Sequence, residues 1–430
     1  MRRAQSADAF EVSPAYGRWV VGLLFGAQTF EIFGRQVLAL VLEPMGADLG
    51  LSDAGRGSLI TAYAICYGLA GPVLARLADR RSRRALIAGC VAASGALLGL
   101  CGLAGGHASL LLARAGLGAA NSGGPPAGAS LLSDYVPPER RGVALGLVGS
   151  GGHVGTLLGL GAWGLVAANY GWRAAFLSAG AVGLAYAALL ALSLREPPRG
   201  WSEARQSEAA EQPALRTVLT LLWGLRSFRH VTAGILLGSM ATMAGGQWNP
   251  AFFMRVHELP VGTAGPALAI VSGLVGASSI ALGGVLADRL VPRDPRWYVR
   301  LPALGMLCAA PLLAAAYLWP APLGAFAFLG MGTVGLMLFA APTATLIQAL
   351  VPLRMRAVAA SLTIVLGVVL GLGLGPWITG QVSDAFAAAG SAEGLRYALV
   401  ASVGLVLWSA LHFALAARHV PRELALRADA

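Results

Sequence analysis

Long apolar segments separated by short polar stretches run through nearly the whole chain. A membrane-spanning helix needs about 20 consecutive apolar residues, and twelve segments meet that requirement. We expect them near residues 19–42, 57–77, 85–105, 109–132, 142–168, 172–194, 231–253, 263–287, 298–319, 322–350, 357–382 and 395–417. The pattern therefore predicts an all-α polytopic membrane protein with twelve transmembrane helices, arranged as two six-helix bundles.

Composition agrees with a membrane protein and excludes several functional classes. Of the 430 residues, 57% are hydrophobic and 12% are charged, and the mean hydropathy is +0.69. The net charge of +11 does not indicate nucleic-acid binding, because the arginines lie in short loops between apolar segments. The sequence shows no nucleophile–base pair, metal-ligand cluster or phosphate-binding loop. We therefore expect no catalytic residues, no metal and no cofactor, and the protein is not expected to be an enzyme.

The distribution of arginines predicts the orientation in the membrane. Arginine-rich loops resist translocation and stay in the cytoplasm. With both termini inside, 25 of the 31 basic residues fall in loops or termini on the cytoplasmic side. The sequence thus predicts a multi-pass protein of the inner (plasma) membrane with two cytoplasmic termini. A short interfacial helix is expected over 217–225.

The two halves of the chain repeat. Five positions recur at one offset of 216 residues, which aligns the glycine series of the fifth predicted helix with that of the eleventh. The pairs are Pro126 with Pro342, Arg140 with Arg356, Gly151 with Gly367, Gly155 with Gly371, and Gly159 with Gly375. Glycine at every fourth residue lets a helix approach its neighbour closely. We expect an N-terminal bundle at 1–195, a central cytoplasmic loop at 196–229 and a C-terminal bundle at 230–430.

Polar side chains inside the apolar segments are candidates for function, because charge in a membrane is costly. Glu31 and Arg35 are four residues apart on the first helix and share a face. Arg114 and Asn121 are two turns apart on the fourth helix and also share a face. Two arginines and one glutamate leave an excess positive charge, which we expect a substrate anion to balance, gripped by Arg35.

Other interpretations of these residues remain open. In one alternative, Arg35 and Glu31 form a structural pair and the Arg114 side chain extends toward the membrane surface. The C-terminal half offers only uncharged candidates for the substrate site, chiefly Trp248 and Asn249 of the seventh helix. One charged half and one apolar, aromatic half suit an amphipathic anion.

A duplicated motif carries the first family resemblance. Residues 75–80 read Ala-Arg-Leu-Ala-Asp-Arg and residues 284–289 read Gly-Val-Leu-Ala-Asp-Arg. They resemble the loop between helices two and three of the major facilitator superfamily and its repeat between helices eight and nine, although Ala75 stands where the family has glycine. The resemblance implies that Asp79 meets the start of helix eleven and that these loops control conformational change. The candidate gating residues are Asp79, Arg80, Arg83, Arg84, Asp288, Arg289 and Arg356.

Further segments resemble the bacterial spinster-like branch of that superfamily. They are 35–39, 59–61, 133–135, 138–141, 170–176, 195–200 and 372–376. The resemblance implies alternating-access transport of lipid-like or amphipathic anions, with Arg35 as the substrate-binding arginine. The branch has an aspartate where this chain has Gly34 and a glutamate where it has Asn121. The resemblance implies that both acids are proton sites, so Glu31 is the candidate substitute for coupling transport to protons.

Three other functions are kept as alternatives. A multidrug/proton antiporter would prefer cations and would use Glu31 as its intramembrane acid. A facilitator for uptake of small carboxylates would use the same arginine in a smaller cavity. A membrane sensor without transport is disfavoured by the two motif copies. In each transport case the partners are a small-molecule or lipid-like substrate and the bilayer, and we expect a monomer.

Overall fold

The computed structural model describes residues 13–197, 215–352, 355–356, 358–359 and 366–428. Contacts divide the chain into two compact units. Unit 1 contains residues 1–41 and 65–210, and unit 2 contains residues 42–64 and 211–430. Residues 42–64, which lie within the expected N-terminal bundle, join unit 2. The polar contacts responsible are described below.

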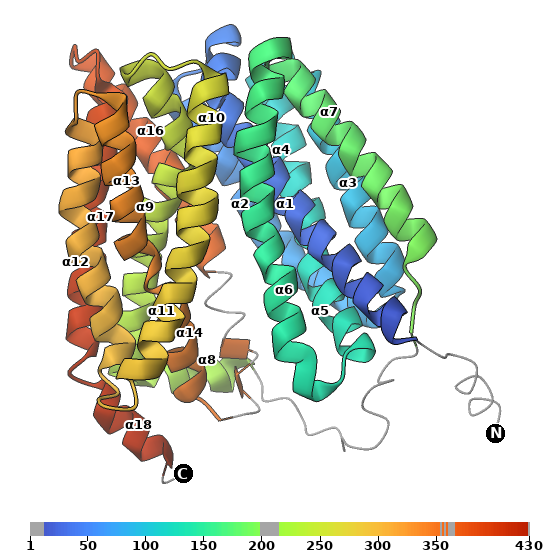
Figure 1. Cartoon of the computed structure of the whole chain (residues 1–430), viewed down its shortest axis with the longest axis vertical. Helices are drawn as coiled ribbons and strands as arrows, with labels where there is room; N and C mark the ends of the chain where they lie inside the picture. Colours follow the sequence, from blue (N-terminus) through green and yellow to red (C-terminus); the bar gives the residue numbers. More distant parts are fainter. Residues whose placement is uncertain (1–12, 198–214, 353–354, 357, 360–365, 429–430) are drawn as a thin grey trace. The chain divides into compact units, whose positions relative to one another are not determined.

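Unit 1 is built from the first set of helices (Figure 1). They are α1 (Pro14–Asp48), α2 (Asp53–Arg80), α3 (Arg83–Gly102), α4 (His107–Asn121), α5 (Gly124–Tyr135), α6 (Pro138–Thr156), the π-helical turn Leu157–Ala162 and α7 (Trp163–Ser193). The ends of α1 and α2 at residues 42–64 belong to unit 2. Within α7, Gly171 has a φ of 82°. This left-handed conformation suits glycine and separates the predicted fifth and sixth helices.

Unit 2 contains the second set of helices. They are α8 (Leu215–Gly224), α9 (Arg226–Val256), α10 (Val261–Ala269), the π-helical turn Ile270–Val275, α11 (Gly276–Leu290), α12 (Trp297–Leu318), α13 (Pro322–Met337), α14 (Ala340–Ala349), the π-helical turn Gly367–Leu372, α16 (Gly373–Ala388), α17 (Gly394–Ala416) and α18 (Val420–Ala428). Helix α17 packs against α9, α12 and α16. Figure 1 shows this group of helices.

The predicted all-α fold is confirmed. Each expected segment coincides with one helix or with consecutive helical pieces, except that 357–382 lies partly outside the described residues. In the part of the chain that the structure describes, seven helices are long and apolar enough to cross a membrane. One of them, Pro138–Ser193, joins two expected spans. The short helix expected at 217–225 appears as α8, whereas α18 was not predicted.

The repeated glycines place one helix directly against another in each unit. In unit 1, a Cβ at Gly151 would lie 2.5 Å from the Phe25 carbonyl oxygen, and one at Gly159 would lie 2.9 Å from the Phe33 carbonyl oxygen. In unit 2, a Cβ at Gly371 would lie 2.8 Å from the Ser239 Cβ. The glycines of α6 and its π-helical turn therefore pack on α1, and those of the 367–375 segment pack on α9. The predicted close approach is confirmed in both units.

Candidate functional site

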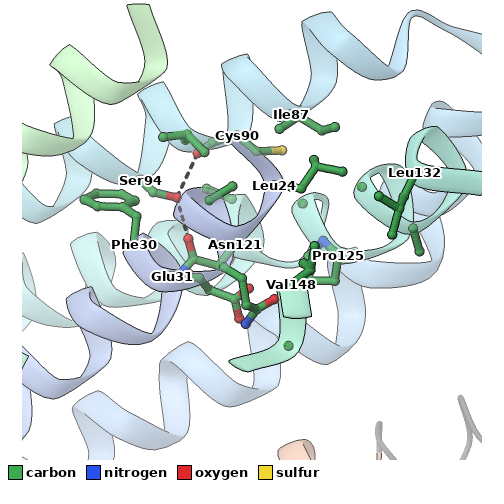
Figure 2. A pocket seen from close by; sticks show the side chains of 18 of the residues that line it. Leu24, Phe30, Glu31, Ile87, Cys90, Ser94, Asn121, Pro125, Leu132 and Val148 are labelled. Carbon is green, nitrogen blue, oxygen red and sulfur yellow. Dashed lines mark hydrogen bonds between the residues drawn. The ribbon is translucent and has the colours of Figure 1, made fainter. Parts of the chain in front are cut away.

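A pocket of about 220 Å³ lies within unit 1, between α1, α3, α4, α5 and α6. Most of its wall is apolar, with side chains such as Leu24, Ile87 and Leu132 (Figure 2). Of the described residues that line it, Glu31 is the one with a charged side chain. Such a wall suits the apolar part of a ligand, and the few polar groups would orient it.

The polar groups of this pocket come from three helices. Glu31 on α1 and Asn121 at the end of α4 are 9% and 7% exposed, and both line the pocket. The Ser94 hydroxyl on α3 lies 2.6 Å from the Asn121 Oδ1 and 2.8 Å from the Cys90 carbonyl oxygen (Figure 2). Ser94 thereby fixes the Asn121 amide beside the Glu31 carboxylate. The structure thus brings together the glutamate and the asparagine that the sequence singled out.

The two candidate arginines lie elsewhere. Neither Arg35 nor Arg114 belongs to the described residues that line the pocket. Arg35 is half-buried one turn after Glu31, close enough for its charge to act on that carboxylate. Arg114 is 2% exposed. The alternative in which the Arg114 side chain extends to the membrane surface is therefore wrong.

The candidates in unit 2 are packed inside their own helices. Trp248 is fully buried and donates a hydrogen bond from its indole nitrogen to the Pro376 carbonyl oxygen, at 2.8 Å. Asn249 is 7% exposed, and its Oδ1 accepts a hydrogen bond from the Tyr317 hydroxyl at 3.2 Å. Both contacts join helices of unit 2, α9 with α16 and α9 with α12. A role in substrate binding stays a prediction for these two residues.

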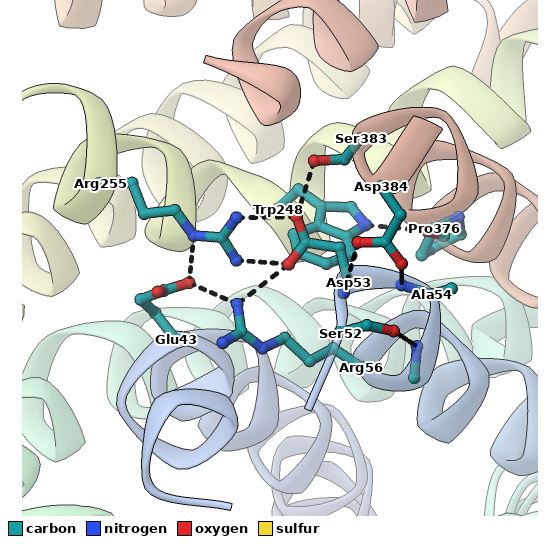
Figure 3. A network of polar contacts seen from close by, with 11 residues as sticks. Glu43, Ser52, Asp53, Ala54, Arg56, Trp248, Arg255, Pro376, Ser383 and Asp384 are labelled. Atoms are coloured by element: carbon teal, nitrogen blue, oxygen red, sulfur yellow. Dashed lines mark hydrogen bonds and ion pairs between the residues drawn. The ribbon is translucent and has the colours of Figure 1, made fainter. Parts of the chain in front are cut away.

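Unit 2 also holds a compact cluster of charges, drawn in Figure 3, which we call the Asp53 cluster. It contains Glu43 from α1, Asp53 and Arg56 from α2, and Arg255 from α9. Arg255 contacts the Asp53 carboxylate with two nitrogens, at 2.7 and 2.5 Å, and the Glu43 carboxylate at 2.5 Å. Arg56 reaches the same two carboxylates at 2.9 and 3.0 Å. Two acids and two guanidinium groups balance in charge, which buried ions require.

A helix cap and close backbone packing complete this region. The Asp384 carboxylate of α16 accepts hydrogen bonds from the Asp53 and Ala54 amides, at 3.0 and 2.9 Å. A carboxylate at a helix N-terminus satisfies free amides and interacts favourably with the helix dipole. At Gly57, a Cβ would lie only 2.8 Å from the Trp377 Cα. These contacts explain why residues 42–64 join unit 2.

Arg83, one of the candidate gating residues, forms ion pairs inside unit 1. It is 2% exposed and contacts Asp134 of α5 at 2.5 Å and Glu196, after α7, at 2.8 Å. Burial alone would raise the pKa of the Glu196 carboxyl. Hydrogen bonds from the Arg84 amide, the Arg83 guanidinium and the Ser82 hydroxyl outweigh burial and lower that pKa below its usual value. Arg83 and Arg84 therefore hold three segments of unit 1 together.

The remaining gating candidates are exposed at helix ends. Asp79 and Arg80 lie at the end of α2 in unit 1, and Asp288 and Arg289 lie near the end of α11 in unit 2. Arg356 is also exposed and lies in unit 2. Their gating role stays a prediction.

Sequence reasoning missed the Asp53 cluster. Arg56 lies in α2 with 6% exposure and Arg255 lies in α9, and helical periodicity does not show that both contact the carboxylates of Glu43 and Asp53. One local signal was present. Asp53 and Arg56 are three residues apart at a helix start, where an acid and a base can pair.

Comparison with known proteins identifies the family. The model of the Major Facilitator Superfamily matches residues 24–376. An MFS-type efflux pump of Mycolicibacterium smegmatis is 29% identical, and the match covers 94% of this chain and 93% of that protein. Protein spinster homolog 1 of Homo sapiens is 27% identical over 87% of this chain and 74% of its own length.

A solved structure agrees with these relatives. A bacterial homologue of the human lysosomal transporter spinster, in an inward-facing and unoccupied conformation, superposes with a TM-score of 0.87 at 28% identity, covering 96% of this chain and 99% of that one. The fold and the relatives are those of membrane transporters and not of enzymes. The chain belongs to the Major Facilitator Superfamily and, within it, is similar to the spinster-like transporters.

Proposed function

We propose that this transporter moves an amphipathic solute by alternating access and that Glu31 is the residue at which a proton and the solute are exchanged. The observation that carries the proposal is the unit 1 pocket, because Glu31 is the one charged side chain among the described residues of its apolar wall. Arg35 acts on this carboxylate from outside the described lining, and within the apolar pocket a proton or a cationic group would compensate its charge directly. Exchange between the two would couple transport to a proton gradient.

Asn121 and Ser94 support this role for Glu31. The hydrogen bond from the Ser94 hydroxyl to the Asn121 Oδ1 fixes the orientation of the Asn121 amide, and both residues line the pocket together with Glu31. The polar groups come from α1, α3 and α4, so a shift of one helix against the others changes the site. A site of that kind can bind differently in two conformations, as coupled transport requires.

The Asp53 cluster supplies a second element of the mechanism. The predicted topology places its members at the external ends of their helices. We infer that it fastens the ends of α1 and α2 to α9 and α16 in one conformation and separates in another. Its four charges are mutually compensated, so separation would require water to replace the lost contacts.

The anionic substrate expected from the sequence is the second candidate. Arg35 lies one turn beyond Glu31 and is half-buried, so an anionic headgroup could reach it while an apolar tail occupies the pocket. The resemblance of the sequence to the spinster-like branch favours this candidate, whereas the described lining of the pocket, with Glu31 as its charged side chain, favours a cation. In both cases we propose a monomer of the inner membrane with cytoplasmic termini.

One binding experiment distinguishes the cationic from the anionic candidate substrate. Purified protein is titrated with tetraphenylphosphonium, a lipophilic cation, and with a lysophospholipid bearing an anionic headgroup. If Glu31 receives the solute, Glu31→Gln abolishes cation binding and Arg35→Gln leaves it in place. If Arg35 receives an anion, Arg35→Gln abolishes lysophospholipid binding. Glu139→Gln, which changes an exposed glutamate at the start of α6, is the matched control. Binding of both ligands by both variants would refute the proposed site.

A further inference from the structure

A groove of about 670 Å³ lies within unit 2 between the start of α12 and the end of α17. Three arginines line it, Arg296 and Arg300 from the α12 side and Arg418 just after α17. The predicted topology places these helix ends at the cytoplasmic surface, where arginines concentrate. The groove is separate from the pocket that contains Glu31.

The charges of this groove are only partly compensated. Asp294 contacts the Arg300 guanidinium at 2.8 Å and accepts a hydrogen bond from the Arg296 amide at 2.9 Å. The Arg300 and Asp294 side chains are 42% and 31% exposed. One carboxylate therefore faces three guanidinium groups, and Arg296 and Arg418 are exposed. An anion that entered the groove would meet a net positive charge.

The remaining wall is apolar and small. Ala303 and Leu304 follow the arginines on one face of α12, and Ala414 and Ala417 face them from α17. The alanines leave room between the two helices. The space is thus charged at one end and apolar at the other, as an amphipathic ligand requires.

The same helix faces continue with exposed leucines. Leu307 lies two turns beyond Arg300 on α12, about 10 Å along the helix axis, and Leu411 lies two turns before Arg418 on α17. Their exposed fractions are 55% and 54%. On a transmembrane helix, such side chains face lipid acyl chains. A phosphate at the arginines would place its acyl chains along these leucines.

We propose that this groove binds an anionic membrane phospholipid, with its headgroup phosphate among Arg296, Arg300 and Arg418 and its acyl chains along Leu307 and Leu411. Basic pockets between transmembrane helices on the cytoplasmic side suit anionic headgroups. Guanidinium groups also hold phosphate oxygens in a paired geometry. The lipid would tie α12 to α17 away from the transported solute, so this inference does not depend on the role of Glu31.

Native mass spectrometry of the purified full chain tests the proposal with phosphatidylglycerol, phosphatidylcholine and inorganic phosphate as probes. The wild type should bind phosphatidylglycerol more tightly than phosphatidylcholine. The double variant Arg296→Gln/Arg418→Gln should weaken phosphatidylglycerol binding about 30-fold, since each arginine contributes about fivefold. The control Arg140→Gln/Arg229→Gln, which removes two other exposed arginines, should change binding by about twofold or less. Equal losses in the two variants, or equal affinity for the two lipids, would overturn the proposal.

Two further arms identify the ligand and its position. Excess inorganic phosphate should displace little phosphatidylglycerol, because phosphate cannot use the apolar wall; full displacement would instead make this a free-anion site. A phosphatidylglycerol with a photoreactive acyl chain should label wild-type protein at Leu304, Leu307 or Leu411. Labelling confined to other helices would contradict the proposal even if the double variant failed to fold.

Discussion

Two buried carboxylates, Glu31 in unit 1 and Asp53 in unit 2, have opposite surroundings. They are 9% and 6% exposed. Asp53 receives contacts from Arg56, Arg255 and Ser383, all at 3.0 Å or less. Glu31 instead faces an apolar pocket, beside an asparagine held by a serine. Burial alone therefore does not identify a functional charge. A carboxylate whose oxygens are engaged in hydrogen bonds and ion pairs with protein groups, which we call saturated, stabilises a fold. A carboxylate that lines a pocket is available to a ligand.

The largest expected effect on stability comes from removing the charge of Asp53, the saturated carboxylate. Asp53→Asn leaves the buried Arg56 and the half-buried Arg255 with one carboxylate, and breaking a buried ion pair costs about 3–5 kcal/mol. We expect a loss of that size in the free energy of unfolding, measured by titration with a denaturing detergent. Glu393→Gln, which removes a carboxylate that is 41% exposed from its pair with Arg396, is the control and should cost about 1 kcal/mol or less. Equal effects would show that the Asp53 cluster is not a stabilising element.

Arg83→Gln tests whether a buried charge that is paired with protein groups also stabilises the fold in unit 1, as Asp53 is expected to do in unit 2. Arg83 contacts Asp134 and Glu196 within unit 1. Its loss leaves the buried Asp134 carboxylate without that contact, so we expect destabilisation of about 3 kcal/mol. Arg140→Gln, an exposed change near the same end of unit 1, should cost about 0.5 kcal/mol or less. The distinction would fail if Arg83→Gln were as mild as this control.

A glycine substitution tests whether the Asp53 cluster depends on close backbone packing. An alanine at Gly57 would bring its Cβ to 2.8 Å from the Trp377 Cα and 3.0 Å from the Pro376 carbonyl oxygen. Backbone atoms cannot move aside as a side chain can, so Gly57→Ala should cost about 1–3 kcal/mol. Gly71→Ala, on the same helix, meets its nearest atom at 3.9 Å and should leave stability unchanged or slightly increased. Equal stability of the two variants would contradict the packing argument.

The smallest effect concerns pH. The hydrogen bonds to Glu196 lower its folded-state pKa, so its contribution to stability is present above its ordinary pKa and is lost as pH falls through the lowered value. The difference in stability between wild type and Glu196→Gln should therefore be constant from neutral pH down to about 5 and should shrink in stronger acid. Thermal unfolding across this range measures it. A difference that grew on acidification would show that the pKa shift has the opposite sign.

The fold was predictable because its signals are local. Helix positions follow from apolar segment length, and the repeated glycines predict where helices meet. The Glu31 pocket was partly predictable, because helical periodicity places Glu31 and Asn121 on inward faces at similar depth. Helical periodicity did not predict that Arg35 lies outside the pocket lining that the structure describes.

The Asp53 cluster could not be predicted in the same way. The contacts that tie α2 to α9 and α16 join residues more than 200 positions apart, such as Asp53 with Arg255 and Asp53 with Ser383. The periodicity of residues within one helix does not predict contacts with residues so distant in the sequence. The expected topology puts these residues at the same side of the membrane, but pairing depends on how α2, α9 and α16 pack.

The most direct test is solute flux driven by a pH gradient in liposomes containing Glu31→Gln, compared with wild type and Glu139→Gln. The variant replaces the charged side chain of the pocket with a neutral one of the same size. We predict that gradient-driven flux falls to the level of empty liposomes while stability in detergent stays within about 1 kcal/mol of wild type. Flux equal to that of wild type would contradict the assignment of Glu31 as the exchange site.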